Sequence, residues 1–165
     1  KNNILWEQFA GNYLSFFGSN KGYSVEIISA EKPTEDKIFS TVEFRADVLD
    51  NDNHLAARSD AGTGTGQFDF ASYNKLPFDS IRAWNEYQDT GHYDNANSVW
   101  VDVALQSMIR RGTNMSQKFR IWRADIPRVY GKPLERIRNP WARIKLSDAG
   151  GNKKTVIHDI GVTYF

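Results

Sequence analysis

The most constraining feature of this chain is a run in which apolar and polar residues alternate. In KIFSTVEFRADV, one side carries Ile38, Val42, Phe44, Ala46 and Val48, and the other side carries Thr41, Glu43, Arg45 and Asp47. A period of two residues is the period of a β-strand, and the polar positions indicate that one face meets water. The run therefore predicts a half-buried strand in an antiparallel sheet.

Shorter runs with the same period fill most of the chain. We expect strands within residues 22–30, 78–88, 98–106, 118–126, 141–148 and 155–165. Between them, residues 89–97 (DTGHYDNAN) predict a long polar loop, and residues 148–154 (DAGGNKK) predict a hairpin turn joining the flanking strands. Strands at this spacing, without helical inserts, predict an all-β fold, either an antiparallel β-sandwich or a jelly-roll-like domain.

Length and composition are those of one domain. A chain of 165 residues fits a single β-sandwich domain, residues 1–165, and it has no cysteine, which excludes disulfides and thiolate metal sites. Residues 56–77 are interpreted as a loop insertion. Near the start, Leu5, Phe9 and Tyr13 are spaced one helical turn apart, which favours a short amphipathic helix or an irregular aromatic arm. Residues 8–20 are too short and too polar to span a membrane, and the opening KNN, without methionine, indicates a fragment of a longer polypeptide.

Charge is divided unevenly along the chain, although the net charge is only +1. Residues 1–109 carry 8 Lys and Arg against 16 Asp and Glu, a net charge of −8, whereas residues 110–165 carry 13 against 4, a net charge of +9. Two interpretations stay open. The basic region forms a surface for nucleic acid or an acidic partner, or the two regions interleave in the folded sheets so that their charges face each other.

Residue patterns for catalysis or for cofactors are absent from the sequence. The three histidines, His54, His92 and His158, are far apart and lack the spacing of metal ligands. The GTGTGQ segment lacks the ending of a phosphate-binding loop, and no GxSxG nucleophile turn occurs. We therefore expect no enzyme activity, no catalytic residues, no metal and no cofactor. A hydrolase would require two carboxylates facing each other across a cleft, about 5–9 Å apart.

Arginine and tryptophan gather in two runs, FRIWRADIPR and LERIRNPWARIKL. In the first run, Arg120 and Arg123 fall on opposite faces of the expected strand, which argues against a single phosphate-binding stripe. Both residue types are enriched at the hot spots of protein interfaces. We therefore predict subunit contacts by Arg120, Arg123, Arg136, Arg138, Trp141 and Arg143.

Five segments, taken in order along the chain, carry a resemblance to a known family. KIFSTVEFRAD, FDSIRAWNEYQDTG, FRIWRADIPR, LERIRNPWARIKL and IHDIGVTYF together resemble the C-terminal region of muzzle-type tail virion proteins of crAss-like bacteriophages. The resemblance covers residues 4–165, and residues 56–77 depart from it. It implies a non-enzymatic virion structural protein, made and assembled in the cytoplasm of the bacterial host. The implied partners are other tail subunits, in a homo-oligomeric ring around the DNA exit path.

Two function classes follow from the sequence and from the resemblance. The leading hypothesis is a structural, protein-binding domain of a phage tail assembly, in which any DNA contact is secondary. The alternative is a carbohydrate-binding β-sandwich module that stacks sugars on exposed aromatic rings. Its candidate residues are Trp84, Trp100 and Trp141, provided that their rings are exposed and coplanar.

Overall fold

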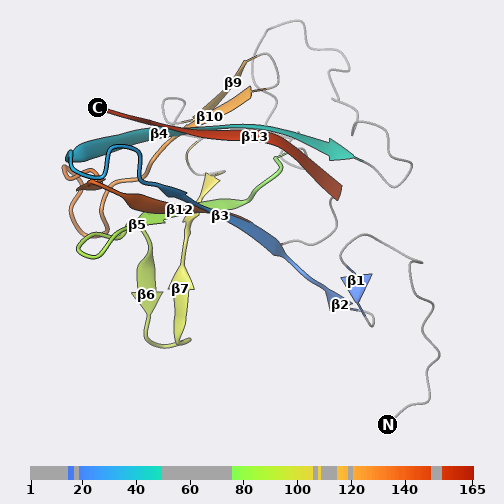
Figure 1. Cartoon of the computed structure of the whole chain (residues 1–165). Coiled ribbons are helices and arrows are strands. Elements are labelled where there is room, and N and C mark those ends of the chain that lie inside the picture. Colours follow the sequence, from blue (N-terminus) through green and yellow to red (C-terminus); the bar gives the residue numbers. More distant parts are fainter. Residues whose placement is uncertain are drawn as a thin grey trace, which may run out of the picture.

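The structure, a computed structural model, describes residues 15–16, 19–49, 76–105, 108, 115–118, 121–149 and 154–165. Every element with described bounds is a strand, which confirms the all-β fold (Figure 1). The strands are β1 (Ser15–Phe16), β2 (Ser19–Asn20), β3 (Tyr23–Ser29), β4 (Lys37–Leu49), β5 (Ser80–Trp84), β6 (His92–Asp94), β7 (Val99–Val101), β8 (Val103–Ala104), β9 (Met115–Lys118), β10 (Ile121–Asp125), β11 (Arg138–Asn139), β12 (Ala142–Asp148) and β13 (Lys154–Tyr164). Apart from β1, the segment expected to be a helix or an aromatic arm lies outside the described residues. So does the expected loop insertion at residues 56–77, except for Leu76 and Pro77, which are buried.

Two antiparallel sheets form the body of the domain. In the larger sheet, β13 pairs with one edge of β4, while β10 and β11 pair with its other edge and β9 lies beside β10. The smaller sheet has the strand order β3-β12-β5-β8. The strands β6 and β7 form a separate hairpin, which projects from the body in Figure 1.

The facing sides of the two sheets enclose one hydrophobic core. Phe44 of β4 and Ile144 and Leu146 of β12 belong to this core, and all three are almost fully buried. The ring of Phe44 meets Phe78 edge to face at 5.3 Å and stacks with Trp122 at 6.5 Å, measured between ring centroids. Because the buried residues of both sheets belong to a single cluster, the β-sandwich prediction is confirmed.

The alternation predicted for β4 holds over most of the strand but reverses near its start. Thr163 of β13 pairs with Thr41, and the next residue, Tyr164, pairs with Phe39, so Ser40 is an extra residue in β4. A bulge of this kind breaks the period of two. Phe39 therefore enters the core, whereas Ile38, which was expected there, is only partly buried.

Several predicted strands and connections differ from the structure. The strand expected over residues 78–88 ends at Trp84, and the loop expected over residues 89–97 contains β6. Residues 98–106 form two strands: β7 pairs with β6, and β8 pairs with β5 of the smaller sheet. The strands on either side of residues 148–154 do not pair with each other, because β12 belongs to the smaller sheet and β13 to the larger one. The strands β8, β12 and β13 take partners that are distant in sequence, whereas β6 and β7 pair locally across a short turn.

Candidate interaction surface

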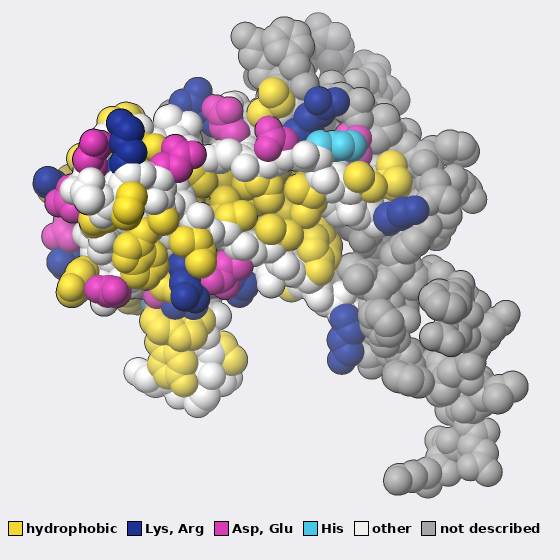
Figure 2. Space-filling model, in the orientation of Figure 1, with side chains coloured by type: hydrophobic (Ala, Val, Ile, Leu, Met, Phe, Trp, Pro, Cys, Tyr) yellow, Lys and Arg dark blue, Asp and Glu magenta, His cyan; other side chains and the backbone are white. Residues whose placement is uncertain are grey.

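The β6–β7 hairpin exposes hydrophobic side chains to solvent. Tyr93, Val99, Trp100 and Val101 are 46%, 50%, 49% and 37% exposed. Figure 2 shows hydrophobic side chains over much of the projecting hairpin. Tyr93 and Trp100 are direct cross-strand partners, and their rings meet edge to face at 5.5 Å between centroids. A group of exposed apolar residues on a projecting element is typical of a protein-binding surface.

The side chain of Asp94 builds the turn of this hairpin. Its Oδ1 accepts the N–H of Ala96 at 2.9 Å, and its Oδ2 accepts the side-chain amide of Asn97 at 2.7 Å. These hydrogen bonds, with that of Asn97 the stronger influence, lower the pKa of Asp94 because they stabilise its charged form. Ser98 completes the turn with a φ of 54°, in the left-handed region. The turn thus has a defined geometry, in which the side chains of Asp94 and Asn97 are hydrogen-bonded to each other.

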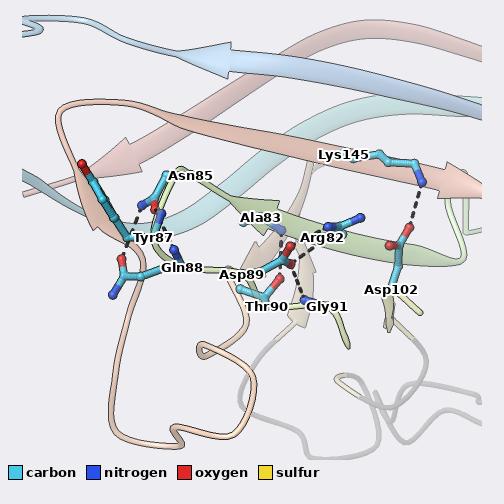
Figure 3. Close-up of polar contacts among 10 residues, drawn as sticks. All are labelled: Arg82, Ala83, Asn85, Tyr87, Gln88, Asp89, Thr90, Gly91, Asp102 and Lys145. Atoms are coloured by element: carbon cyan, nitrogen blue, oxygen red, sulfur yellow. Dashed lines mark hydrogen bonds and ion pairs between the residues drawn. The ribbon is translucent and has the colours of Figure 1, made fainter. Parts of the chain in front are cut away.

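Arg82 of β5 joins the hairpin to the smaller sheet. Its guanidinium lies 3.7 Å from the centroid of the Trp100 ring and 4.8 Å from that of Trp84. It also donates two hydrogen bonds to Asp89, at 2.9 Å from Nε to Oδ1 and 2.5 Å from Nη2 to Oδ2 (Figure 3). The side chains of Arg82 and Asp89 are only 11% and 24% exposed, so this two-pronged pair is shielded from water. It holds Trp100 against the domain.

Side chains of the loop between β5 and β6 fix the path of that loop (Figure 3). Asn85 Oδ1 accepts the backbone N–H groups of Tyr87 and Gln88, at 2.8 and 2.9 Å. Thr90 and Ala83 exchange two hydrogen bonds: the Thr90 N–H donates to the Ala83 carbonyl at 3.0 Å, and the Ala83 N–H donates to Thr90 Oγ1 at 2.9 Å. The loop therefore presents the exposed ring of Tyr87 from an ordered backbone.

The residues predicted for subunit contacts do not gather on one surface. Arg123 lies on the outer face of the larger sheet, and Arg143 lies on the outer face of the smaller sheet. Trp141 is half-buried just before β12, and Arg120 lies outside the described residues. Whether any of these residues contacts another subunit stays a prediction.

Arg136 and Arg138, by contrast, lie beside the same open depression. It has a volume of about 390 Å³ and is lined by Ile38, Gln88, Arg128, Leu134, Glu135, Arg136 and Arg138. Arg138 also lies 3.6 Å from Asp36, in an ion pair exposed to solvent. Arg128, the last residue of the FRIWRADIPR run, was not among the six predicted contact residues, but it lines the depression together with two of them.

Ion pairs join the basic region of the sequence to the acidic region. They link residues on neighbouring strands or segments: Arg123–Glu43 at 3.5 Å, Arg138–Asp36 at 3.6 Å, Arg143–Glu26 at 3.3 Å and Lys145–Asp102 at 3.1 Å, the last drawn in Figure 3. His158 Nε2 likewise lies 2.8 Å from Asp47 Oδ2. The fold thus interleaves the two regions so that opposite charges face each other.

The histidines of the described chain do not gather into a metal site. His92 stacks on Tyr130 at 4.8 Å between ring centroids, and His158 is hydrogen-bonded to Asp47. His54 lies outside the described residues. Among the described residues, no group of three His, Asp or Glu side chains could hold a metal ion. Within the same part of the chain, no helix has the length and hydrophobicity needed to cross a membrane.

Comparison with known proteins identifies the family of this domain. A family model described as the Crassvirus muzzle protein C-terminal domain matches residues 11–129. The chain belongs to the Crassvirus muzzle family. A curated relative, the muzzle protein of Bacteroides phage crAss001, is 36% identical over 166 aligned residues that cover the whole of this chain. The chain spans about a tenth of the length of that muzzle protein. These matches confirm the resemblance that five sequence segments carry.

The muzzle-family sequence holds a signal for the hairpin that the sequence analysis missed. Turn-forming residues 94–98 (DNANS) lie between His92–Tyr93 and Val99–Trp100–Val101. Turn residues between short aromatic and β-branched runs are typical of a β-hairpin. Trp100 was singled out only as a candidate for sugar stacking, whereas the structure groups it with Tyr93 and Arg82.

Proposed function

We propose that this chain is a non-enzymatic, structural and protein-binding domain of the phage tail, and that the β6–β7 hairpin contacts other virion subunits. Membership of the muzzle family supports a virion structural role. Assembly in the host cytoplasm is part of the proposal. The observation that carries the binding role is the exposed Tyr93–Trp100 pair on a projecting hairpin. The partners are other tail subunits, including further copies of the same protein in a ring. Trp, Tyr and Arg are the residues that most often dominate such interfaces.

The geometry of the hairpin favours binding because the side chain of Trp100 is already ordered before a partner binds. Arg82 and Tyr93 contact the ring of Trp100, so the indole does not have to be immobilised when a partner arrives. Ordering a free side chain at an interface costs about 0.5–1.5 kcal/mol. A preordered Trp100 avoids most of that cost.

The same contacts reduce support for a carbohydrate-binding role. The guanidinium of Arg82 already lies over Trp84 and Trp100, and Trp141 is half-buried. These rings therefore offer less free stacking surface to a sugar. DNA contact stays secondary in this proposal, because the exposed Arg123 and Arg143 already have carboxylate partners.

Site-specific photo-cross-linking in intact particles tests the contact directly. A benzoylphenylalanine in place of Trp100, within the full-length muzzle protein of assembled phage, is expected to give intermolecular cross-links. The matched control carries the same probe at Ile157, an exposed apolar residue of β13 in the larger sheet. Cross-links from position 100 to a second copy support the ring, and cross-links to a different virion protein support a heterologous contact. If position 100 gives no intermolecular product beyond the Ile157 control, the hairpin is not a subunit contact and the proposal fails.

A further inference from the structure

A second surface feature, with no lining residue from the β6–β7 hairpin, is the depression of about 390 Å³ beside the start of β4. Three of its lining residues are arginines, Arg128, Arg136 and Arg138, and two are apolar, Ile38 and Leu134. Leu134 is almost fully exposed. The depression therefore combines positive charge with apolar surface.

Within the described part of the chain, two of these arginines have no acidic partner for their charge. Among the described residues, Arg128 and Arg136 have no carboxylate oxygen within 4.0 Å. Glu135, the acidic residue of the lining, is bound by Lys132 at 3.0 Å. Most other arginines in the described chain are paired with a carboxylate, namely Arg82, Arg123, Arg138 and Arg143. The depression thus presents positive charge that the described chain leaves without compensation.

The backbone that carries these arginines is fixed by hydrogen bonds. Gln88 Oε1 accepts the N–H of Arg138 at 2.7 Å, and Gln88 Nε2 donates to the carbonyl of Arg136 at 3.3 Å. The carbonyl of Glu135 accepts the N–H of Val129 at 3.1 Å, which closes the loop of residues 129–135 directly after Arg128. The backbone that carries these guanidinium groups is therefore ordered before a ligand binds, which lowers the entropic cost of binding.

We propose that this depression binds a side-chain carboxylate from an acidic segment of a neighbouring protein subunit. The planar guanidinium groups of Arg128 and Arg136 match a carboxylate in two-pronged geometry. Ile38 and Leu134 contact an apolar residue next to that carboxylate. A DNA backbone fits less well, because tracking phosphates requires a row of cations, and here an acid and two apolar side chains lie among them. The inference deepens the proposed function, on which the identity of the partner as a tail subunit rests.

Fluorescence anisotropy with the 165-residue chain tests the proposal. The probe is a labelled octapeptide of alternating glutamate and leucine, compared with the same peptide carrying glutamine for glutamate and with a labelled single-stranded DNA dodecamer. The Arg128→Gln/Arg136→Gln variant is expected to bind the acidic peptide at least about tenfold more weakly, because each charge-assisted hydrogen bond is strong. The matched control, Arg45→Gln/Arg123→Gln, removes two positive charges that do not line the depression and is expected to change affinity less than about twofold.

Four results would overturn the proposal. The first is that the unaltered chain shows no saturable binding of the acidic peptide, and the second is that it binds the glutamine peptide equally well. The third is that both double variants lose affinity for the acidic peptide to the same extent. The fourth is that the unaltered chain binds the DNA more tightly than the acidic peptide and that Arg128→Gln/Arg136→Gln abolishes this DNA binding. The last result would assign the depression to phosphate. If the double variant does not fold, the unaltered chain decides: the backbone amide signals of Gln88 and Arg138 must shift when the acidic peptide is titrated in NMR. Failure of this test leaves the cross-links expected from Trp100 unaffected, so the two proposals fail separately.

Discussion

The Arg82–Asp89 pair provides a quantitative test of how the hairpin surface is held. In an Asp89→Asn variant, the side chain keeps its shape, but the charge that faces Arg82 is lost. Arg82 then keeps its positive charge in a position where its side chain is only 11% exposed, against the rings of Trp84 and Trp100. Removing one partner of a shielded pair leaves the other charge without compensation, which costs more than the intact pair contributes.

The exposure of the two side chains sets the expected size of the effect. Exposed ion pairs contribute about 0.2–1 kcal/mol, whereas breaking a fully buried pair costs about 3–5 kcal/mol. With exposures of 11% and 24%, the pair lies between these limits, and we expect Asp89→Asn to lower the free energy of unfolding by about 2 kcal/mol. For a chain of 165 residues, this is a fall of about 4–8 °C in Tm.

Urea unfolding of the 165-residue chain, followed by tryptophan fluorescence, measures this loss. The matched control is Glu26→Gln, which removes the carboxylate facing Arg143 at 3.3 Å, where the side chains of Arg143 and Glu26 are 46% and 41% exposed. We expect the control to lose about 0.5 kcal/mol or less. Equal losses in the two variants, or an Asp89→Asn variant as stable as the unaltered chain, would refute the reasoning that burial determines the strength of the pair.

Two further predictions follow from close packing and from proton linkage. In Gly91→Ala, the added methyl carbon would lie 2.9 Å from the Val101 carbonyl oxygen, so we expect a loss of about 1–3 kcal/mol in urea unfolding, and an unchanged midpoint would contradict the close approach. Burial raises the pKa of Tyr23 to about 12, against the effect of its hydrogen bond with Thr155. Because the pKa of Tyr23 in the folded chain exceeds the unfolded value of 10.0, the contribution of Tyr23 to the free energy of unfolding is complete below pH 10. It declines between pH 10 and 12, where the unfolded chain loses the proton more readily than the folded chain. The stability difference between the unaltered chain and Tyr23→Phe should therefore be constant below pH 10 and shrink above it, and a difference independent of pH would argue against the raised pKa.

The strands could be predicted from the sequence because burial on one face imposes an alternation that is visible locally. Val25 and Ile27 of β3, and Ile144 and Leu146 of β12, point toward the core as the period of two predicts. The sandwich followed from the same pattern, since strands that are apolar on one side need a second sheet to cover them.

The connections could not be predicted, because a local pattern does not say which sheet a strand joins. The segment DAGGNKK has the composition of a hairpin turn, yet it leads from one sheet to the other. The run SVWVDVALQ alternates without interruption, yet the chain changes strand partners at Asp102, whose carboxylate pairs with Lys145 of β12. Long-range pairing of this kind has no signature in a single sequence.

The candidate surfaces were only partly accessible for the same reason. The sequence shows Arg136 and Arg138 close together in one run. Their position beside Arg128, however, depends on hydrogen bonds between the side chain of Gln88, which is distant in sequence, and the backbone of Arg136 and Arg138. Arg123 was visible as a candidate contact, but its pairing with Glu43 depends on the register between β10 and β4. Residue type can be read from a sequence, whereas the partner of a charge requires the fold.

The position of β4 has a consequence for how this domain forms. This strand of 13 residues precedes its described pairing partners, β10, β11 and β13, which all come from the last third of the 165 residues. Such long-range pairing makes folding slow, because the entropy of closing large loops is lost before the contacts that repay it are made. Meanwhile an unpaired strand with an apolar row is a template for aggregation. We therefore expect the apolar row of β4 to be open to aggregation until β10, β11 and β13 have been synthesised and can pair with it.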